Sequence, residues 1–189
     1  MAEYDTSDFK TGLKIEMDGE PYTIVDFQHV KPGKGNQFTR TKIRNLLTGR
    51  VLERTLKSGE KVGKPDMESQ EVQYLYDDGE NCYFMNTSTY DQFPIADNVL
   101  GDVKYFLKEE TKVNVLFYNG RPINVEPPIF VYLTVTEAEP GIKGDTASGA
   151  TKPVVLETGY RVNVPLFINQ GDVLKIDTRT GDYTDRVKK

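Results

Sequence analysis

The chain has 189 residues, of which 37% are hydrophobic and 28% are charged, and its formal net charge is −5. No run approaches the roughly 18 consecutive apolar residues that a membrane-spanning helix needs, and the acidic first five residues do not fit a signal peptide. Cys82 and His29 are the only residues of their types, which excludes an intrachain disulfide and a zinc-binding cluster. We therefore expect a cytoplasmic protein built from about one to three small domains.

Charge is distributed unevenly along the chain. Residues 1–64 carry 12 basic and 9 acidic residues, residues 65–128 carry 4 and 12, and residues 129–189 carry 8 and 8. Within residues 31–57 the only acidic residue is Glu53, and the eight basic residues are Lys31, Lys34, Arg40, Lys42, Arg44, Arg50, Arg54 and Lys57. Such a concentrated basic stretch indicates local contact with phosphate, although a solvated barrel face gives the same pattern.

Residues 12–64 alternate between short strand patterns and turns. Apolar and polar residues alternate in short strand-like runs, and turn signals such as Asp18-Gly19 and Thr48-Gly49 separate these runs. Closely spaced short strands of this kind predict a small β-barrel. Lys42 and Arg44 fall on one strand face, opposite Ile43, so the basic side chains are expected to point away from the core.

Two of these strands, at residues 22–27 and 38–47, flank the segment Lys31-Pro32-Gly33-Lys34-Gly35-Asn36-Gln37. We predict that this segment is the tip of a β-hairpin. Pro32 fixes its own φ, and Gly33 and Gly35 permit positive φ and leave no side chains beside Lys34. A lysine exposed on such a tip can enter a narrow cleft in a partner, although a solvated hairpin tip without a binding function has the same composition. The segment is not a phosphate-binding P-loop, because a glycine follows the lysine and a strand pattern replaces the helix.

A domain boundary is predicted at residues 63–66, where Gly and Pro interrupt the pattern and the sign of the charge changes. Residues 65–127 contain two hairpin patterns, and the second includes Asn119-Gly120, which suits a type I′ turn. Between the hairpins, apolar residues from Val99 to Leu107 form one stripe of a helix. Strands with a single interposed helix indicate an OB-type barrel.

Pro127-Pro128 stiffens the chain before residues 128–189. Strand patterns at residues 129–136, 160–168 and 173–177 predict another OB-type barrel, a fold that commonly binds single-stranded nucleic acid. The loop at residues 139–149 is rich in small residues and long enough to serve a site. The predicted fold class is therefore all-β, with three small β-barrel domains at residues 1–64, 65–127 and 128–189.

Signatures of catalysis are missing from the sequence. It holds no Gly-x-Ser-x-Gly motif, no Rossmann fingerprint and no His/Cys or His/Ser pairing. Its acidic residues lie mostly in turns, such as Asp77, Asp78 and Asp182, where solvation explains them better than acid–base chemistry. We expect a non-catalytic binding module without cofactor or metal, whose basic face holds phosphate and whose lysine tip enters the partner.

Several motifs occur in fixed order along the chain. They are Val30-Lys31-Pro32-Gly33-Lys34-Gly35, then Phe38-x-Arg40-x-Lys42-x-Arg44-Asn45-Leu46-x-Thr48-Gly49, Pro140-Gly141-Ile142-Lys143-Gly144-Asp145-Thr146, Val164-Pro165-Leu166-Phe167, and Gly181-x-Tyr183-x-x-Arg186. Together they resemble the motifs of the bacterial elongation factor P family, and the resemblance runs from Asp8 to Arg186. Tyr74-Leu75-Tyr76 and Pro127-Pro128 also lie where the family has similar residues.

The resemblance implies an L-shaped protein that imitates tRNA, with a KOW-type, SH3-like barrel followed by two OB folds. Members of this family bind the ribosome between the peptidyl-tRNA and exit sites. They relieve stalling at consecutive prolines, including Pro-Pro-Gly. Their modified residue corresponds to Lys34, which would reach the peptidyl-transferase centre and help to orient the peptidyl-tRNA.

The resemblance, together with the basic pattern, also suggests which residues contact RNA. In the first barrel, the expected contacts with peptidyl-tRNA or ribosomal RNA are Lys31, Pro32, Gly33, Gly35, Arg40, Lys42, Arg44 and Arg54. In the third barrel, Gly144, Asp145, Thr146, Tyr183 and Arg186 would face the small subunit and the exit-site codon. Ordinary packing for Tyr183 and a solvated position for Arg186 remain open alternatives.

Lysine at position 34 excludes the rhamnosylated-arginine branch of the family. It leaves open β-lysylation, with or without hydroxylation, and an aminopentanol-type modification, each of which implies its own modifying enzyme. Family members often have a small residue before the position of Phe38, where this chain has Asn36-Gln37. This difference could change how a modifying enzyme recognises the loop. The alternative function is a general single-stranded-RNA-binding OB protein, against which the acidic middle segment argues because it would repel free RNA.

Overall fold

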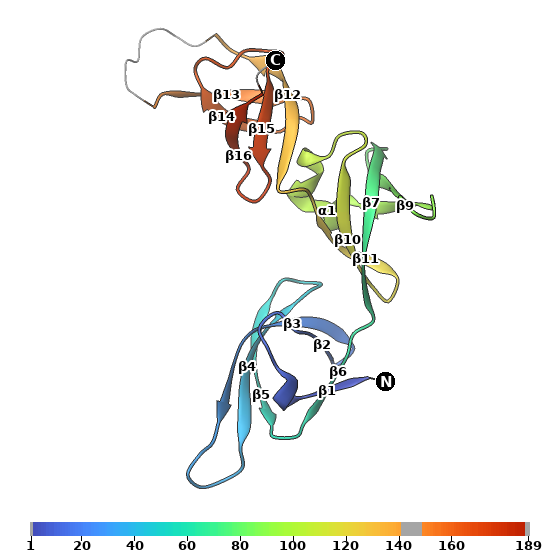
Figure 1. The fold of residues 1–189 in the computed structure, drawn as a ribbon, viewed down its shortest axis with the longest axis vertical. Helices are drawn as coiled ribbons and strands as arrows, with labels where there is room; N and C mark the ends of the chain where they lie inside the picture. The colour runs from blue at the N-terminus through green and yellow to red at the C-terminus, as the bar shows by residue number, and fades with distance from the viewer. Residues whose placement is uncertain (1, 141–148, 188–189) are drawn as a thin grey trace. The chain divides into compact units, whose positions relative to one another are not determined.

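The computed structural model describes residues 2–140 and 149–187, and β-strands dominate it (Figure 1). The chain divides into two compact units, one formed by Met1–Glu68 with Phe117–Ile123 and the other by Ser69–Leu116 with Asn124–Lys189. Among the described residues the strands form three sheets. The all-β prediction is therefore confirmed. None of the helices in the described ranges has the length and apolar character that crossing a bilayer requires.

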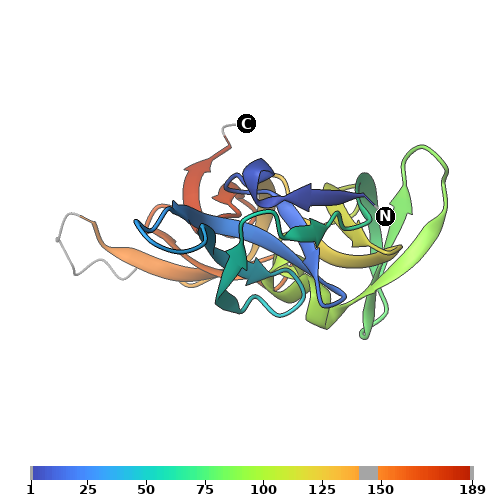
Figure 2. The ribbon, with the colours of Figure 1, turned by 90° about the horizontal axis from the view of Figure 1, so that it is seen from below.

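The first sheet has the strand order β1-β6-β2-β3-β4-β5. Its strands are β1 (Glu3–Asp5), β2 (Lys14–Met17), β3 (Glu20–Val30), β4 (Phe38–Asn45), β5 (Val51–Lys57) and β6 (Lys61–Gly63), with a 3-10 helix, η1 (Thr6–Asp8), after β1. Figures 1 and 2 show these strands, coloured blue to blue-green, curling into a barrel-like layer. The core contains Phe9, Ile15, Tyr22, Ile24, Ile43, Leu56 and Val62.

Strand β4 ends at Asn45, two residues earlier than the sequence pattern predicts. The Asn45 Oδ1 atom accepts hydrogen bonds from the backbone N–H groups of Leu47 and Thr48, at 2.8 and 3.0 Å. Its Nδ2 atom donates to Glu20 Oε2 at 2.7 Å. An asparagine that bonds to its own following turn competes with the strand ladder, so the chain leaves the sheet at this point.

The second sheet has the order β11-β10-β7-β8-β9. Its strands are β7 (Met67–Asp77), β8 (Asn81–Asn86), β9 (Gln92–Ala96), β10 (Lys112–Tyr118) and β11 (Arg121–Glu126). The turn between β10 and β11 has positive φ at both central residues, 48° at Asn119 and 75° at Gly120. This geometry is that of a type I′ turn, which confirms the prediction from the Asn-Gly pair.

The predicted helix is present but divided. A short α-helix, α1 (Asp97–Leu100), is followed by a 3-10 helix, η2 (Gly101–Phe106). Gly101 has φ of 53°, outside the right-handed helical region, and its N–H donates to the Asp97 carbonyl. The glycine therefore ends the α-helix inside the apolar stripe, while Leu100, Phe106 and Leu107 are still buried.

The third sheet has the order β14-β13-β12-β15-β16. Its strands are β12 (Phe130–Ala138), β13 (Thr151–Leu156), β14 (Arg161–Pro165), β15 (Val173–Asp177) and β16 (Asp182–Arg186). Strand β14 is shorter than predicted, because the chain turns after Pro165, whose carbonyl accepts from the Ile168 N–H at 3.2 Å. Ile168 is nevertheless fully buried in the core of this sheet.

The second and third sheets share one strand order. In each, the first strand (β7 or β12) is central, with the next two strands on one side and the last two on the other. In the second sheet the helical segment lies between the third and fourth strands. Five antiparallel strands in this Greek-key order are an OB fold, as the sequence predicts.

Candidate functional site

The hairpin that carries Lys34 is formed by β3 and β4, which remain paired up to Val30 and Phe38. Its base is fixed by two hydrogen bonds. His29 Nδ1 and Thr39 Oγ1 are 2.8 Å apart, and the Ser58 N–H donates to the Gln37 carbonyl at 3.1 Å. Residues 31–37 are all exposed. The lysine is therefore presented on an exposed tip with an anchored base, as the sequence predicts.

The two glycines beside Lys34 have different roles. Gly35 has φ of 109°, a conformation that L-residues with a side chain rarely adopt, whereas Gly33 is not in that region. A β-carbon on Gly33 would meet no atom within 4 Å, and one on Gly35 would lie 3.9 Å from Pro32 Cγ. Both glycines permit positive φ, and Gly35 is the one of the two that adopts it.

Three cations form an exposed row on β4. Arg40, Lys42 and Arg44 are exposed and alternate with buried residues of the same strand, which confirms the outward face predicted for Lys42 and Arg44. The Arg40 guanidinium lies 5.8 Å from the centre of the Phe38 ring. We call Arg40, Lys42 and Arg44 the cationic row.

Acidic residues flank the centre of the cationic row. Lys42 is in register with Asp26 of β3 and with Glu53 of β5. A hollow of about 360 Å³ at this place is lined by Asp26, Phe27, Gln28, Arg40, Thr41, Lys42, Glu53, Arg54 and Thr55. The surface is therefore of mixed sign with an excess of positive charge, which suits a phosphate contact of limited extent.

Arg54 does not extend the cationic row across the sheet. It is in register with Thr41, and register partners in an antiparallel pair share a face, so Arg54 lies on the face opposite the row. Its guanidinium is 3.7 Å from Asp18 Oδ2, in an exposed ion pair. The sequence argument grouped Arg54 with the row because it could not supply the register of β5.

Two of the five candidate residues of the third barrel, Tyr183 and Arg186, have partners within that barrel. Gly144, Asp145 and Thr146 lie outside the described residues. Tyr183 packs against the core of the sheet, and burial raises the pKa of its hydroxyl. The Arg186 guanidinium is 3.5 Å from Asp172 Oδ2 and 5.2 Å from the centre of the Phe167 ring. Packing within the barrel thus explains the position of much of the Tyr183 side chain. By contrast, 39% of the Arg186 side chain is exposed to solvent.

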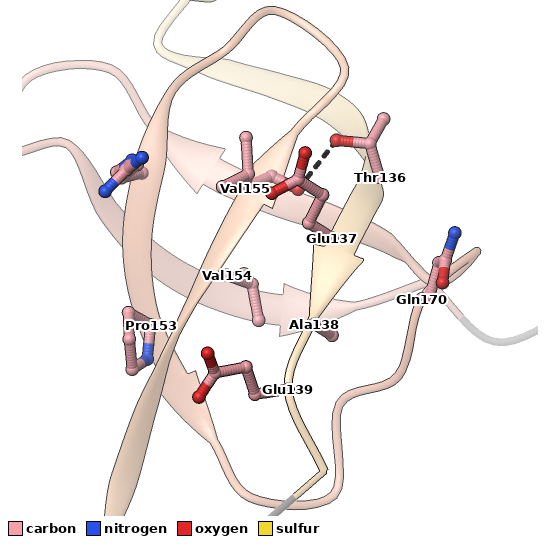
Figure 3. Close-up of a pocket in the computed structure, with 9 residues that line it drawn as sticks. Thr136, Glu137, Ala138, Glu139, Pro153, Val154, Val155 and Gln170 are labelled. Carbon is pink, nitrogen blue, oxygen red and sulfur yellow. Dashed lines mark hydrogen bonds between the residues drawn. The ribbon is translucent and has the colours of Figure 1, made fainter.

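A hollow of about 450 Å³ in the third barrel is not signalled by any sequence motif (Figure 3). It opens where the β12–β13 register shifts between Val135 and Glu137. It is lined by Thr136, Glu137, Ala138, Glu139, Pro153, Val154, Val155, Arg161 and Gln170. Thr136 Oγ1 donates to the Val155 carbonyl at 3.1 Å. Carboxylates, a guanidinium and apolar atoms share the lining, so its chemistry does not select one class of ligand.

Cys82 is buried in β8 of the middle barrel. Its sulfur lies in a group with carboxylate oxygens of Asp77 and Asp97, all within 4.8 Å of one another. Desolvation raises the pKa of the Cys82 thiol to about 11, so the thiol is protonated at neutral pH and is a poor metal ligand. The Lys104 ammonium, 2.9 Å from Asp97 Oδ2, already supplies a positive charge to this group.

Three family models match consecutive parts of the chain. They are described as the elongation factor P KOW-like domain at residues 5–62, the elongation factor P OB domain at residues 67–125, and the elongation factor P C-terminal domain at residues 131–186. The chain belongs to the elongation factor P family. The resemblance inferred from the motifs is confirmed, and the chain is thereby a translation elongation factor.

Individual relatives are similar over nearly the whole chain. Elongation factor P of Bdellovibrio bacteriovorus is 55% identical over 186 residues, covering 98% of this chain and 99% of that protein. Elongation factor P of Carboxydothermus hydrogenoformans is 57% identical over 182 residues, covering 96% and 98%.

Solved structures share the fold at lower identity. A eukaryotic translation initiation factor 5A from Methanococcus jannaschii aligns with a TM-score of 0.58 and 21% identity, over 67% of this chain and 92% of that chain. An initiation factor 5A family protein from Naegleria fowleri aligns with a TM-score of 0.55 and 16% identity, over 66% and 97%. At these identities the likeness supports the barrel folds alone.

Proposed function

We propose that the chain binds the ribosome between the peptidyl-tRNA and exit sites and stimulates peptide-bond formation at consecutive prolines, including Pro-Pro-Gly. The observation that carries the proposal is Lys34, an exposed cation on a glycine-flanked tip whose base is anchored by hydrogen bonds. This geometry suits a side chain that enters a narrow site in a large partner. Family membership supplies the ribosome as that partner.

In this proposal Lys34 acts by orientation. Proline is a poor nucleophile and constrains the nascent chain, so holding the peptidyl-tRNA in a reactive position can speed bond formation without acid–base chemistry from the factor. A modification of Lys34 would lengthen its reach toward the peptidyl-transferase centre and add hydrogen-bond donors. The factor itself is then non-catalytic, needs no cofactor or metal, and has a Lys34-modifying enzyme as a second partner.

The remaining contacts divide between barrels. The cationic row and the tip residues Lys31, Pro32, Gly33 and Gly35 would lie along phosphates of peptidyl-tRNA or ribosomal RNA, with Arg54 approaching from the opposite sheet face. Gly144, Asp145, Thr146, Tyr183 and Arg186 would face the small subunit and the exit-site codon. The same proposal includes three domains, at residues 1–64, 65–127 and 128–189. It also includes an L-shaped monomer that imitates tRNA and a cytoplasmic location.

The test compares two lysine variants in a reconstituted translation system that reports synthesis through a Pro-Pro-Gly sequence. Lys34→Ala should abolish rescue while leaving the thermal unfolding curve unchanged, because the side chain is exposed and makes no hydrogen bond or ion pair with the described residues. Lys14→Ala removes an exposed lysine from β2 of the same barrel and should retain full rescue. Full rescue by Lys34→Ala would overturn the proposal. The mass of the Lys34 peptide from native protein identifies the modification.

A second candidate function is that of a general single-stranded-RNA-binding protein, which the two OB strand orders favour. It predicts tight binding of free oligonucleotides with a steep dependence on salt. The 12 acidic residues against 4 basic ones in residues 65–128 argue against it, because they repel free RNA. A filter-binding measurement with oligoadenylate distinguishes the two functions.

A further inference from the structure

Tyr76 of the middle barrel faces outward because of a β-bulge. Tyr74 is in register with Phe84, a core residue, and strict alternation would also direct Tyr76 inward. The register shifts between Tyr74 and Tyr76, so that Tyr76 pairs with Tyr83. A bulge re-aims the side chains that follow it. As a result 52% of Tyr76 is exposed, although its sequence position suggests a core residue.

The re-aimed ring becomes part of an ordered surface. The Tyr76 and Tyr83 rings stack with centres 4.7 Å apart and planes inclined by 16°. Tyr83 is in turn in register with Pro94 of β9, which is exposed. The three side chains therefore run across three strands on one face of the sheet. We call Tyr76, Tyr83 and Pro94 the aromatic strip.

Carboxylates lie beside the aromatic strip, in the turn between β7 and β8. The Asp78 Oδ1 atom accepts from the backbone N–H groups of Glu80 and Asn81, at 3.0 and 2.8 Å. These bonds hold the pKa of Asp78 below its ordinary value, so it stays charged at neutral pH. Within the described residues, neither Asp78 nor Glu80 is in an ion pair with Lys or Arg. Asp78 and Glu80 thus present negative charge that no ion pair offsets among the described residues.

Among the described residues, no basic residue of this barrel forms an ion pair with Asp78 or Glu80. Of the four in residues 65–128, three are in ion pairs: Lys104 with Asp97, Lys108 with Glu157, and Lys112 with Glu71. The faces of stacked tyrosines attract cations through their ring quadrupole. A surface with one exposed and one half-buried tyrosine ring beside carboxylates outside ion pairs is complementary to arginine, which stacks on rings and pairs with carboxylates. The same surface repels phosphate.

We propose that the aromatic strip and the adjoining Asp77–Glu80 turn bind an arginine-rich segment of a protein partner. One guanidinium stacks on the Tyr76 ring, and neighbouring cations of the segment pair with the turn carboxylates. This surface goes beyond the proposed function, because it recognises protein by charge opposite to that used for RNA by the cationic row. The test of this surface does not depend on any role of Lys34.

The experiment titrates the isotope-labelled full chain with a decapeptide of alternating arginine and glycine and follows backbone amides by NMR. Shifts are expected at Tyr76, Asn81 and Tyr83. The same peptide with citrulline for arginine keeps the shape and removes the charge, and should bind at least tenfold more weakly. Single-stranded oligoadenylate of ten nucleotides should leave these amides unshifted.

Two tyrosine variants complete the test. Tyr76→Ala should weaken binding of the arginine peptide about fivefold, the scale of a partly exposed cation–π contact. Tyr90→Ala removes a tyrosine that is 71% exposed elsewhere in the same barrel and should change the affinity less than twofold. The proposal is overturned if the shifts map to other surfaces, if the citrulline peptide binds equally well, if oligoadenylate shifts the strip, or if the two tyrosine variants behave alike.

Discussion

The conformation of Gly35 offers a sharp test of how the Lys34 tip works. Gly35→Ala places a β-carbon on a residue with φ of 109°. Holding a residue with a side chain in such a sparsely populated region costs about 1–3 kcal/mol. Since about 1.4 kcal/mol is a factor of ten, the native tip conformation should become roughly 5- to 150-fold less populated relative to alternatives. The barrel itself should remain folded, because the tip is exposed.

Gly33→Ala is the matched control, because it adds the same methyl group on the other side of Lys34 in open space. In the Pro-Pro-Gly translation assay Gly35→Ala should lose most of its rescue activity at limiting factor concentration, and Gly33→Ala should keep it. NMR spectra should show a displaced Lys34 amide only in the Gly35 variant. Equal activity of the two variants, with the amide displaced in one, would refute the view that a defined tip conformation positions Lys34.

Three other measurements test buried or charged groups of the barrels. Thr41→Val should raise the free energy of unfolding by about 1 kcal/mol, because the Thr41 hydroxyl is buried with no hydrogen-bond partner among the described residues. Thr39→Val should lower the free energy of unfolding by about 1 kcal/mol, because it removes a hydrogen bond to the imidazole nitrogen of His29. Urea unfolding of both variants measures the two changes. Hydrogen bonds from the Arg179 side chain and backbone lower the pKa of Asp177 to about 2, so the stability that Asp177 contributes is complete above its ordinary pKa of 3.8 and is lost as the pH falls toward 2. A carboxyl NMR titration of Arg179→Gln should show the Asp177 pKa raised toward its ordinary value, because the backbone hydrogen bond remains. Because burial raises the pKa of Cys82 to about 11, a thiol reagent at about pH 8 should react only after unfolding, and rapid reaction of the native chain would contradict the burial.

The parts of the fold that sequence predicted well depend on local chemistry. Asn119-Gly120 gives its turn because both residues tolerate positive φ. The cationic row follows from a period of two along β4, which places Lys42 and Arg44 on the face opposite Ile43. In each case neighbours within a few residues decide the outcome, so the pattern is readable without the rest of the chain.

Two side-chain positions that spacing could not assign depend on register, which is set by pairing between distant segments. Arg54 was grouped with the cationic row, but its pairing with Thr41 places it on the other face. Tyr76 has the alternation of a core residue, and only the bulge before it turns the ring outward. A one-residue shift reverses the face of every following side chain, so neither position could be assigned from spacing alone.

Under the proposed function, the distribution of charge explains why few residues would need to carry the RNA contact. The net charge of −5 comes from residues 65–128, which carry 12 acidic and 4 basic residues. This acidic region disfavours non-specific binding to the abundant RNA that a translation factor meets. Contact is then favoured only where cations gather, at the cationic row and at the Lys34 tip. The same acidic excess, concentrated in residues 65–128, leaves the aromatic strip free for a basic protein segment. Opposite charges on different barrels thus favour one orientation on a partner that contains both RNA and protein, before any close contact forms.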